Sequence, residues 1–115
     1  MLINAHHEAM IEHSTLSVMF TVDRGVSHEM VRHRIASFAQ ESTRYVNYSK
    51  DKYGNEINVI DLAPGIALDR RMQDMPAETI KAILNEWELA MLDAEKHYMK
   101  MIELGATAQI ARSVL

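Results

Sequence analysis

Residues 76–105, PAETIKAILNEWELAMLDAEKHYMKMIELG, carry the strongest structural signal in this chain. Apolar residues recur there at the three- and four-residue spacing that places side chains on one face of an α-helix. The members of this apolar stripe are Ile80, Ile83, Leu84, Trp87, Ala90, Met91, Ala94, Tyr98, Met101 and Ile102. Pro76 suits the start of a helix and Gly105 suits its C-terminal cap. We therefore predict one long helix through about Leu104, whose stripe packs against the core or against another subunit.

The flanking segments predict short strands and shorter helices. Leu16–Val22 and Ile57–Leu62 are rich enough in apolar and β-branched residues to form strands. After a turn at Asp23–Gly25, Val26–Arg34 suits a short helix, whereas polar residues in Ile35–Tyr48 predict an irregular segment. Three further features are a break at Pro64–Gly65, a helical turn at Leu68–Gln73 and the opening of a helix at Ala106–Val114. The predicted fold class is α+β, with short mixed or antiparallel strands packed on one long helix in a single domain, residues 1–115.

Composition restricts the classes of function. Cysteine is absent, which excludes disulfide scaffolds, thiolate metal sites and thiol catalysis and fits a reducing cytoplasm. No apolar run approaches the roughly 18 residues that span a bilayer, so we expect no membrane association. Residues 1–13 lack the basic start and apolar stretch of a secretory signal, and the expected location is the cytoplasm.

The charges are unevenly distributed. The net charge of −4 argues against binding a nucleic acid polymer through a basic surface. The segment from Arg24 to Arg44, however, contains four arginines and two histidines but only two glutamates. This local excess of positive charge favours a small phosphorylated ligand.

A dense polar run lies at the centre of this basic region. Arg32-His33-Arg34 cannot share one helix face, since neighbouring positions diverge by about 100°. Taken alone, it could be a solvated basic turn at a helix C-terminus, where the dipole favours positive charge. The residues from Gln40 to Tyr45 add hydroxyl, amide and guanidinium donors of the kind that bind a phosphate ester.

The full stretch, RHRIASFAQESTRY at residues 32–45, resembles the defining motif of the flavin-dependent thymidylate synthases, the thymidylate synthase complementing protein family. The resemblance extends from His6 to about Tyr48 and returns in GATAQIARSVL at residues 105–115. It implies reductive methylation of dUMP to dTMP, with methylenetetrahydrofolate as the carbon donor and electrons passed from NADPH through FAD. It also implies a homotetramer with active sites between subunits, and further family segments beyond both ends of these residues.

The resemblance assigns residues to two ligands. Those implied for the cofactor FAD are His7, Arg32, His33, Arg34 and Gln40. Those implied for the substrate dUMP are Glu29, Arg32, Gln40, Glu41, Ser42, Thr43, Arg44 and Arg112, with Arg44 on the phosphate. Glu29 departs from the glutamine common in the family, and a carboxylate there needs another partner. Ser42 is interpreted as a ligand-binding residue because no Asp-His pair stands in a recognisable relation to it.

Two alternatives complete the interpretation. Histidines and glutamates cluster in residues 6–13, but their spacing is not the i, i+4 histidine pair of a metalloprotease helix, so we predict no metal site. The alternative to an enzyme is a truncated, non-catalytic module that binds FAD or a nucleotide, or that serves oligomerisation.

Overall fold

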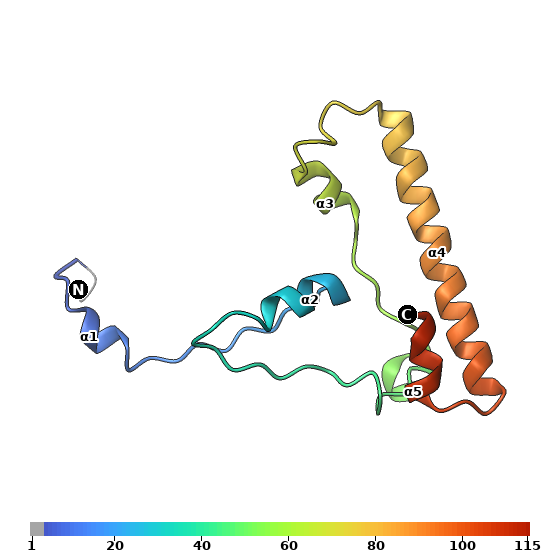
Figure 1. Ribbon diagram of the computed structural model, residues 1–115, viewed down its shortest axis with the longest axis horizontal. Helices are drawn as coiled ribbons and strands as arrows, with labels where there is room; N and C mark the ends of the chain where they lie inside the picture. Colours follow the sequence, from blue (N-terminus) through green and yellow to red (C-terminus); the bar gives the residue numbers. More distant parts are fainter. Residues whose placement is uncertain (1–3) are drawn as a thin grey trace.

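The computed structural model describes residues 4–115, in which helical segments alternate with extended chain (Figure 1). In chain order these segments are α1 (Glu8–Ile11), α2 (Arg24–Met30), the 3-10 turn η1 (Asp51–Tyr53), α3 (Ala63–Leu68), α4 (Ala77–Glu103), α5 (Ala108–Ala111) and the 3-10 turn η2 (Arg112–Val114). The chain returns after α4, so that α5 and η2 lie against the C-terminal half of that helix (Figure 1).

The long helix α4 confirms the strongest sequence prediction. Pro76 precedes it in an extended conformation, with φ of −56° and ψ of 139°. Gly105 terminates it with φ of 96°, a left-handed conformation that glycine adopts without steric cost. The amides of Gly105 and Ala106 donate to the carbonyls of Ile102 and Met101, both at 2.9 Å, which is the Schellman pattern. Neither α4 nor any other helix in the described part of the chain is apolar over a length sufficient to cross a membrane.

The α+β prediction is wrong, because residues 4–115 contain no β-strand. Leu16–Val22 and residues 57–61 are extended (Figure 1), whereas Leu62 has helical backbone angles, and the two segments form no ladder of backbone hydrogen bonds. Leu16 is 88% exposed and Met19 is 92% exposed. The two segments approach each other only at one end, where Val22 and Ile60 line the same shallow hollow. Local sequence produces the extended conformation, but a sheet also needs a neighbouring strand to complete its hydrogen bonds.

The shorter predicted elements shift in position. The helix expected at Val26–Arg34 is α2, which starts earlier because the Asp23 carboxylate accepts from the Val26 amide at 2.8 Å. Pro64, predicted as a break, instead lies in the first turn of α3, where its missing amide hydrogen costs no helical bond. Of the helical turn predicted at Leu68–Gln73, Leu68 is the last residue of α3, and residues 70–73 form a turn outside any helix.

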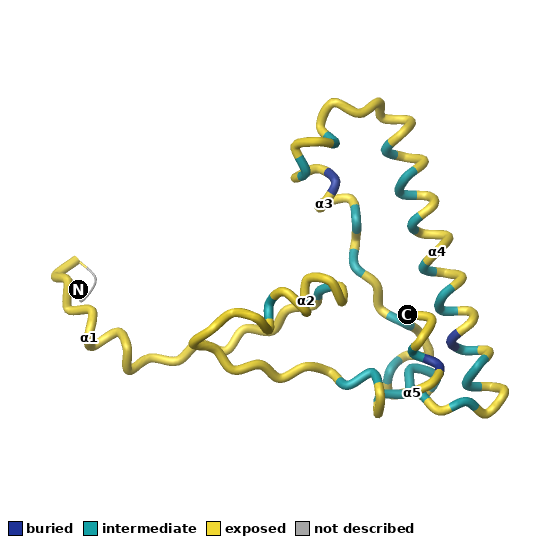
Figure 2. Tube along the Cα trace, in the orientation of Figure 1, coloured by how far each residue is buried: buried dark blue, intermediate teal, exposed yellow. Residues whose placement is uncertain are grey.

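Few side chains are buried, and they lie in two places: within α3, and where α5 lies against the C-terminal half of α4 (Figure 2). The buried apolar residues among those described are Ile66, Tyr98 and Ala111, and Tyr98 is 0% exposed. The radius of gyration is 19.7 Å, against about 13 Å for a compact domain of about this length. The chain is therefore open, and much of its apolar surface has no cover from within the described residues.

Candidate functional site

Two side-chain hydrogen bonds connect the polar run after residue 40 to the C-terminal segment. Arg112 Nη1 donates to Thr43 Oγ1 at 3.1 Å, and Arg44 Nε donates to Gln109 Oε1 at 3.4 Å. Three predicted site residues, Thr43, Arg44 and Arg112, thus lie together although they come from distant parts of the sequence. The sequence interpretation missed Gln109. Its position three residues before Arg112, on the same side of a helical turn, was the available signal.

Two contacts orient the side chain of Arg44 and leave its two Nη groups accessible. Its guanidinium lies over the Tyr45 ring, 5.4 Å from the centroid, while Nε is engaged by Gln109. Among residues 4–115, neither Nη atom of Arg44 has a hydrogen-bond partner. Because the two Nη groups form a planar fork, they suit an oxyanion such as a phosphate.

The segment carrying Glu41 and Ser42 is bound to α4 through Tyr48. The Tyr48 hydroxyl donates to Glu41 Oε1 at 2.7 Å, and its backbone amide donates to the hydroxyl of Tyr98 at 3.3 Å. Burial and the Glu41 carboxylate raise the pKa of the Tyr48 phenol well above its usual value. The Ser42 carbonyl accepts from the amides of Tyr45 and Val46, which curls the segment into a turn.

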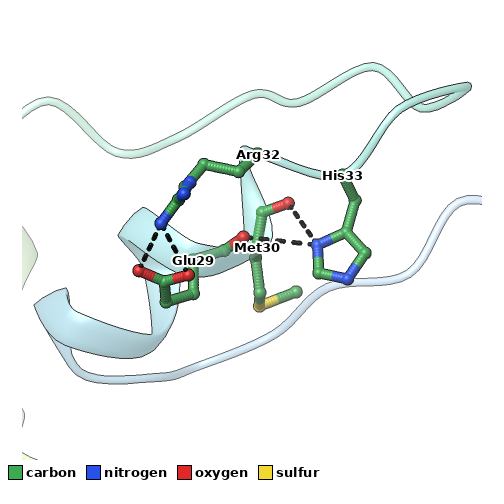
Figure 3. A network of polar contacts seen from close by, with 4 residues as sticks. All are labelled: Glu29, Met30, Arg32 and His33. Carbon is green, nitrogen blue, oxygen red and sulfur yellow. Dashed lines mark hydrogen bonds and ion pairs between the residues drawn. The ribbon is translucent and has the colours of Figure 1, made fainter.

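A second group forms at the end of α2 (Figure 3). Arg32 Nη1 contacts both carboxylate oxygens of Glu29, at 2.9 and 3.0 Å. His33 Nδ1 donates to the carbonyls of Glu29 and Met30, at 3.2 and 3.1 Å, which requires the hydrogen on Nδ1. These contacts supply the partner that the Glu29 carboxylate needed, and they satisfy carbonyls at the helix end.

The remaining predicted site residues lie apart. His7 is exposed immediately before α1, and Arg34 and Gln40 are exposed on either side of Ile35, whose φ is 60°. Within residues 4–115, no hydrogen bond or ion pair joins the Glu29–His33 group to the Glu41–Arg44 group. Nor do three His, Cys, Asp or Glu side chains of that range gather closely enough to hold a metal ion.

Comparison with known proteins identifies the family. The family model described as "Thymidylate synthase complementing protein" matches residues 1–115. The flavin-dependent thymidylate synthase of Pyrococcus abyssi is 29% identical over 112 residues, which cover 95% of this chain and 39% of that protein. The protein of the same name from Geobacter sulfurreducens is 29% identical over 117 residues, covering 99% of this chain and 43% of that protein.

A third relative matches a shorter region more closely. The flavin-dependent thymidylate synthase of Clostridium tetani is 43% identical over 54 residues, covering 46% of this chain and 22% of that protein. The chain thus spans less than half the length of these relatives. No solved structure matches it. Because the family match runs from the first residue to the last, the resemblance in residues 32–45 is confirmed, and the chain belongs to the thymidylate synthase complementing protein family.

Proposed function

We propose that this chain forms part of a flavin-dependent thymidylate synthase, which methylates dUMP to dTMP with methylenetetrahydrofolate and NADPH by way of FAD. Its relatives carry the name of this enzyme. The observation that carries the proposal is the pair of arginines, Arg44 and Arg112, brought together around Thr43. Both arginines thus belong to one contact between residues 43–44 and residues 109–112, and two cations in one such contact suit a phosphorylated substrate.

In this proposal the nucleotide phosphate binds the open face of Arg44. The free Nη fork would donate to phosphate oxygens, and the hydroxyl of Ser42 and the guanidinium of Arg112 would complete the donor set. Charge-assisted hydrogen bonds of this kind contribute roughly 1.5–3 kcal/mol each. The other residues that we propose for dUMP are Glu29, Arg32, Gln40, Glu41 and Thr43.

The residues proposed for FAD offer donors suited to its diphosphate. Arg32 and His33 lie at the exposed end of α2, where the contact of Nδ1 with backbone carbonyls leaves the opposite ring nitrogen of His33 facing away from the helix. Arg34 and Gln40 are exposed and add a further cation and an amide. Together with His7 these groups match the charge of the cofactor. Bound FAD supplies the redox chemistry of the reaction.

Open apolar surface supports the proposed assembly into a homotetramer. Leu16, Phe20 and Ile35 are 88%, 60% and 107% exposed. Burying large exposed apolar side chains against another subunit would remove their surface from water, which stabilises a contact by about 25 cal/mol per Å². The extended segments also offer backbone groups that a neighbouring strand could pair with. We propose that such subunits act together in the cytoplasm on dUMP and folate, and not on a nucleic acid polymer or a membrane.

Two measurements on the purified chain distinguish the enzyme from the non-catalytic binding module. Adding dUMP to the chain mixed with FAD is expected to change the flavin absorption spectrum. With methylenetetrahydrofolate and NADPH present, tritium is expected to leave dUMP labelled at the carbon that is methylated. A spectral change without tritium release would favour the non-catalytic binding module. Absence of both would reject the proposal for this chain.

The carboxylate of Glu29 is expected to compete with ligand for Arg32. In Glu29→Gln the neutral amide no longer pairs with the guanidinium, so FAD should bind more tightly. An exposed ion pair contributes up to about 1 kcal/mol, and the gain should therefore reach at most about fivefold. Fluorescence titration of FAD would measure it. Glu78→Gln, a carboxamide change on the exposed face of α4, is the matched control and should have no effect. Weaker FAD binding by Glu29→Gln would show that the carboxylate assists the ligand.

A further inference from the structure

Three tyrosines form an aromatic cluster where the polar run reaches α4. The Tyr48 ring meets the ring of Tyr98 at 5.7 Å between centroids, with an interplanar angle of 60°. It meets the ring of Tyr53 at 6.0 Å and 66°. Both are edge-to-face arrangements, which the ring quadrupoles favour. Because Tyr98 is a completely buried residue of α4, the cluster attaches the ring of Tyr48 to the longest helix of the described residues.

Hydrogen bonds extend this attachment to the polar run. The hydroxyl of Tyr98 accepts the Tyr48 amide, and the hydroxyl of Tyr48 donates to Glu41 at 2.7 Å. That distance lies within the range expected for a hydroxyl bonded to a carboxylate. A continuous series of contacts therefore runs from α4 through Tyr48 to the carboxylate of Glu41. Since the pKa of Tyr48 is raised, its hydroxyl keeps its hydrogen and remains a donor.

We propose that Tyr48 is a positioning residue, which holds the Glu41 carboxylate against the aromatic cluster and so keeps it off the guanidinium of Arg44. The inference rests on the proposed function, in which Ser42, Arg44 and Arg112 bind the phosphate of dUMP. Glu41 itself is exposed and would otherwise sample several rotamers.

The restraint on Glu41 prevents its carboxylate from pairing with the guanidinium of Arg44. A free carboxylate near Arg44 in the chain would compete with the phosphate for its guanidinium, just as the Glu29 carboxylate engages Arg32. Such a pair would occupy the fork that the phosphate needs. By accepting the hydroxyl of Tyr48, Glu41 is directed toward the aromatic cluster and leaves the Nη groups of Arg44 open. Tyr48 thus lowers the cost of ordering the site before the ligand arrives.

The first test compares two hydroxyl deletions. Tyr48→Phe keeps the ring contacts and removes only the hydroxyl that meets Glu41. We expect this variant to bind dUMP about tenfold more weakly in calorimetric titration. Tyr53→Phe is the matched control, because no hydrogen bond of its hydroxyl is found among the described residues, and it should alter dUMP affinity less than twofold. Equal losses in both variants would reduce Tyr48 to a packing residue and overturn the inference.

A double-mutant cycle tests whether the effect passes through Glu41. In a Glu41→Ala background, Tyr48→Phe should change dUMP affinity less than twofold, because the group that it positions is gone. A loss that persists undiminished in this background would contradict the positioning role. General destabilisation would act equally in both backgrounds.

A measurement without ligand keeps the inference separate from the proposed function. Carbon-13 relaxation of the Glu41 side chain should report greater motion in Tyr48→Phe than in wild type or Tyr53→Phe. If wild-type protein fails to bind dUMP while this difference is observed, the proposed substrate is wrong and the positioning contact stands. If Glu41 is equally mobile in all three proteins, the positioning role is wrong whatever the ligand.

Discussion

Tyr98→Ala is expected to lower the free energy of unfolding by about 3–5 kcal/mol, the range for removing a large aromatic side chain from a packed site. Tyr98 is 0% exposed and is the largest fully buried side chain among the residues described. Its ring contacts Tyr48, and its hydroxyl accepts the Tyr48 amide. The substitution therefore leaves a cavity and a backbone donor without a partner. Denaturant unfolding followed by far-ultraviolet circular dichroism would measure the loss.

Two further variants on α4 control this result. Tyr98→Phe keeps the ring and removes one hydrogen bond, so it should cost about 1 kcal/mol. Leu89→Ala truncates a residue of the same helix that is 54% exposed, and in an isolated chain it should cost well below the Tyr98→Ala value. If Leu89→Ala and Tyr98→Ala destabilise equally, the buried cluster is not the principal core. A cost of Leu89→Ala that grows with protein concentration would indicate that its surface is a subunit contact.

The sequence predicted those elements whose signals are local. In α4 the apolar period, the preceding proline and Gly105 all lie within or beside the helix, so no distant residue was needed to infer it. The two expected strands failed for the opposite reason. Leu16–Val22 and Ile57–Leu62 have the composition of strands, but a ladder depends on a partner strand that their own residues do not specify. The segments lack this partner within the described residues, and several of their apolar side chains are exposed instead.

In the candidate site, too, contacts with a local sequence signal could be predicted and contacts between distant residues could not. The chemistry of its side chains identified the run of polar residues from Gln40, whereas Arg112 was inferred only from the family resemblance, and the structure joins Thr43 to Arg112 across 69 positions. The contact of Glu29 with Arg32 follows from i, i+3 spacing on one helix face. Tyr98 was predicted to pack within the apolar stripe, and it does. Its bond to Tyr48, 50 positions away, has no local signature and could not be inferred from the sequence.

Arg44→Ala is expected to weaken dUMP binding by about tenfold to a hundredfold, because it removes charge-assisted hydrogen bonds worth roughly 1.5–3 kcal/mol. FAD binding should change less than about twofold. Arg44 contacts Gln109 and Tyr45, and no described contact joins it to the Glu29–His33 group. Arg34→Ala should show the reverse pattern. Calorimetric titration with dUMP and fluorescence titration with FAD measure both. Equal loss of the two ligands in Arg44→Ala would show that its role is misassigned.

The phosphate itself provides the decisive control for Arg44. Deoxyuridine retains the base and the sugar of dUMP and lacks the phosphate, so Arg44→Ala should bind it as well as wild type does. Arg44→Lys keeps one positive charge and loses the planar fork, and it should fall between wild type and alanine for dUMP alone. A guanidinium that contacted the uracil ring would instead produce the same loss with both ligands. That outcome would move Arg44 from the phosphate to the base and would leave Arg112 as the nearest remaining cation for the phosphate.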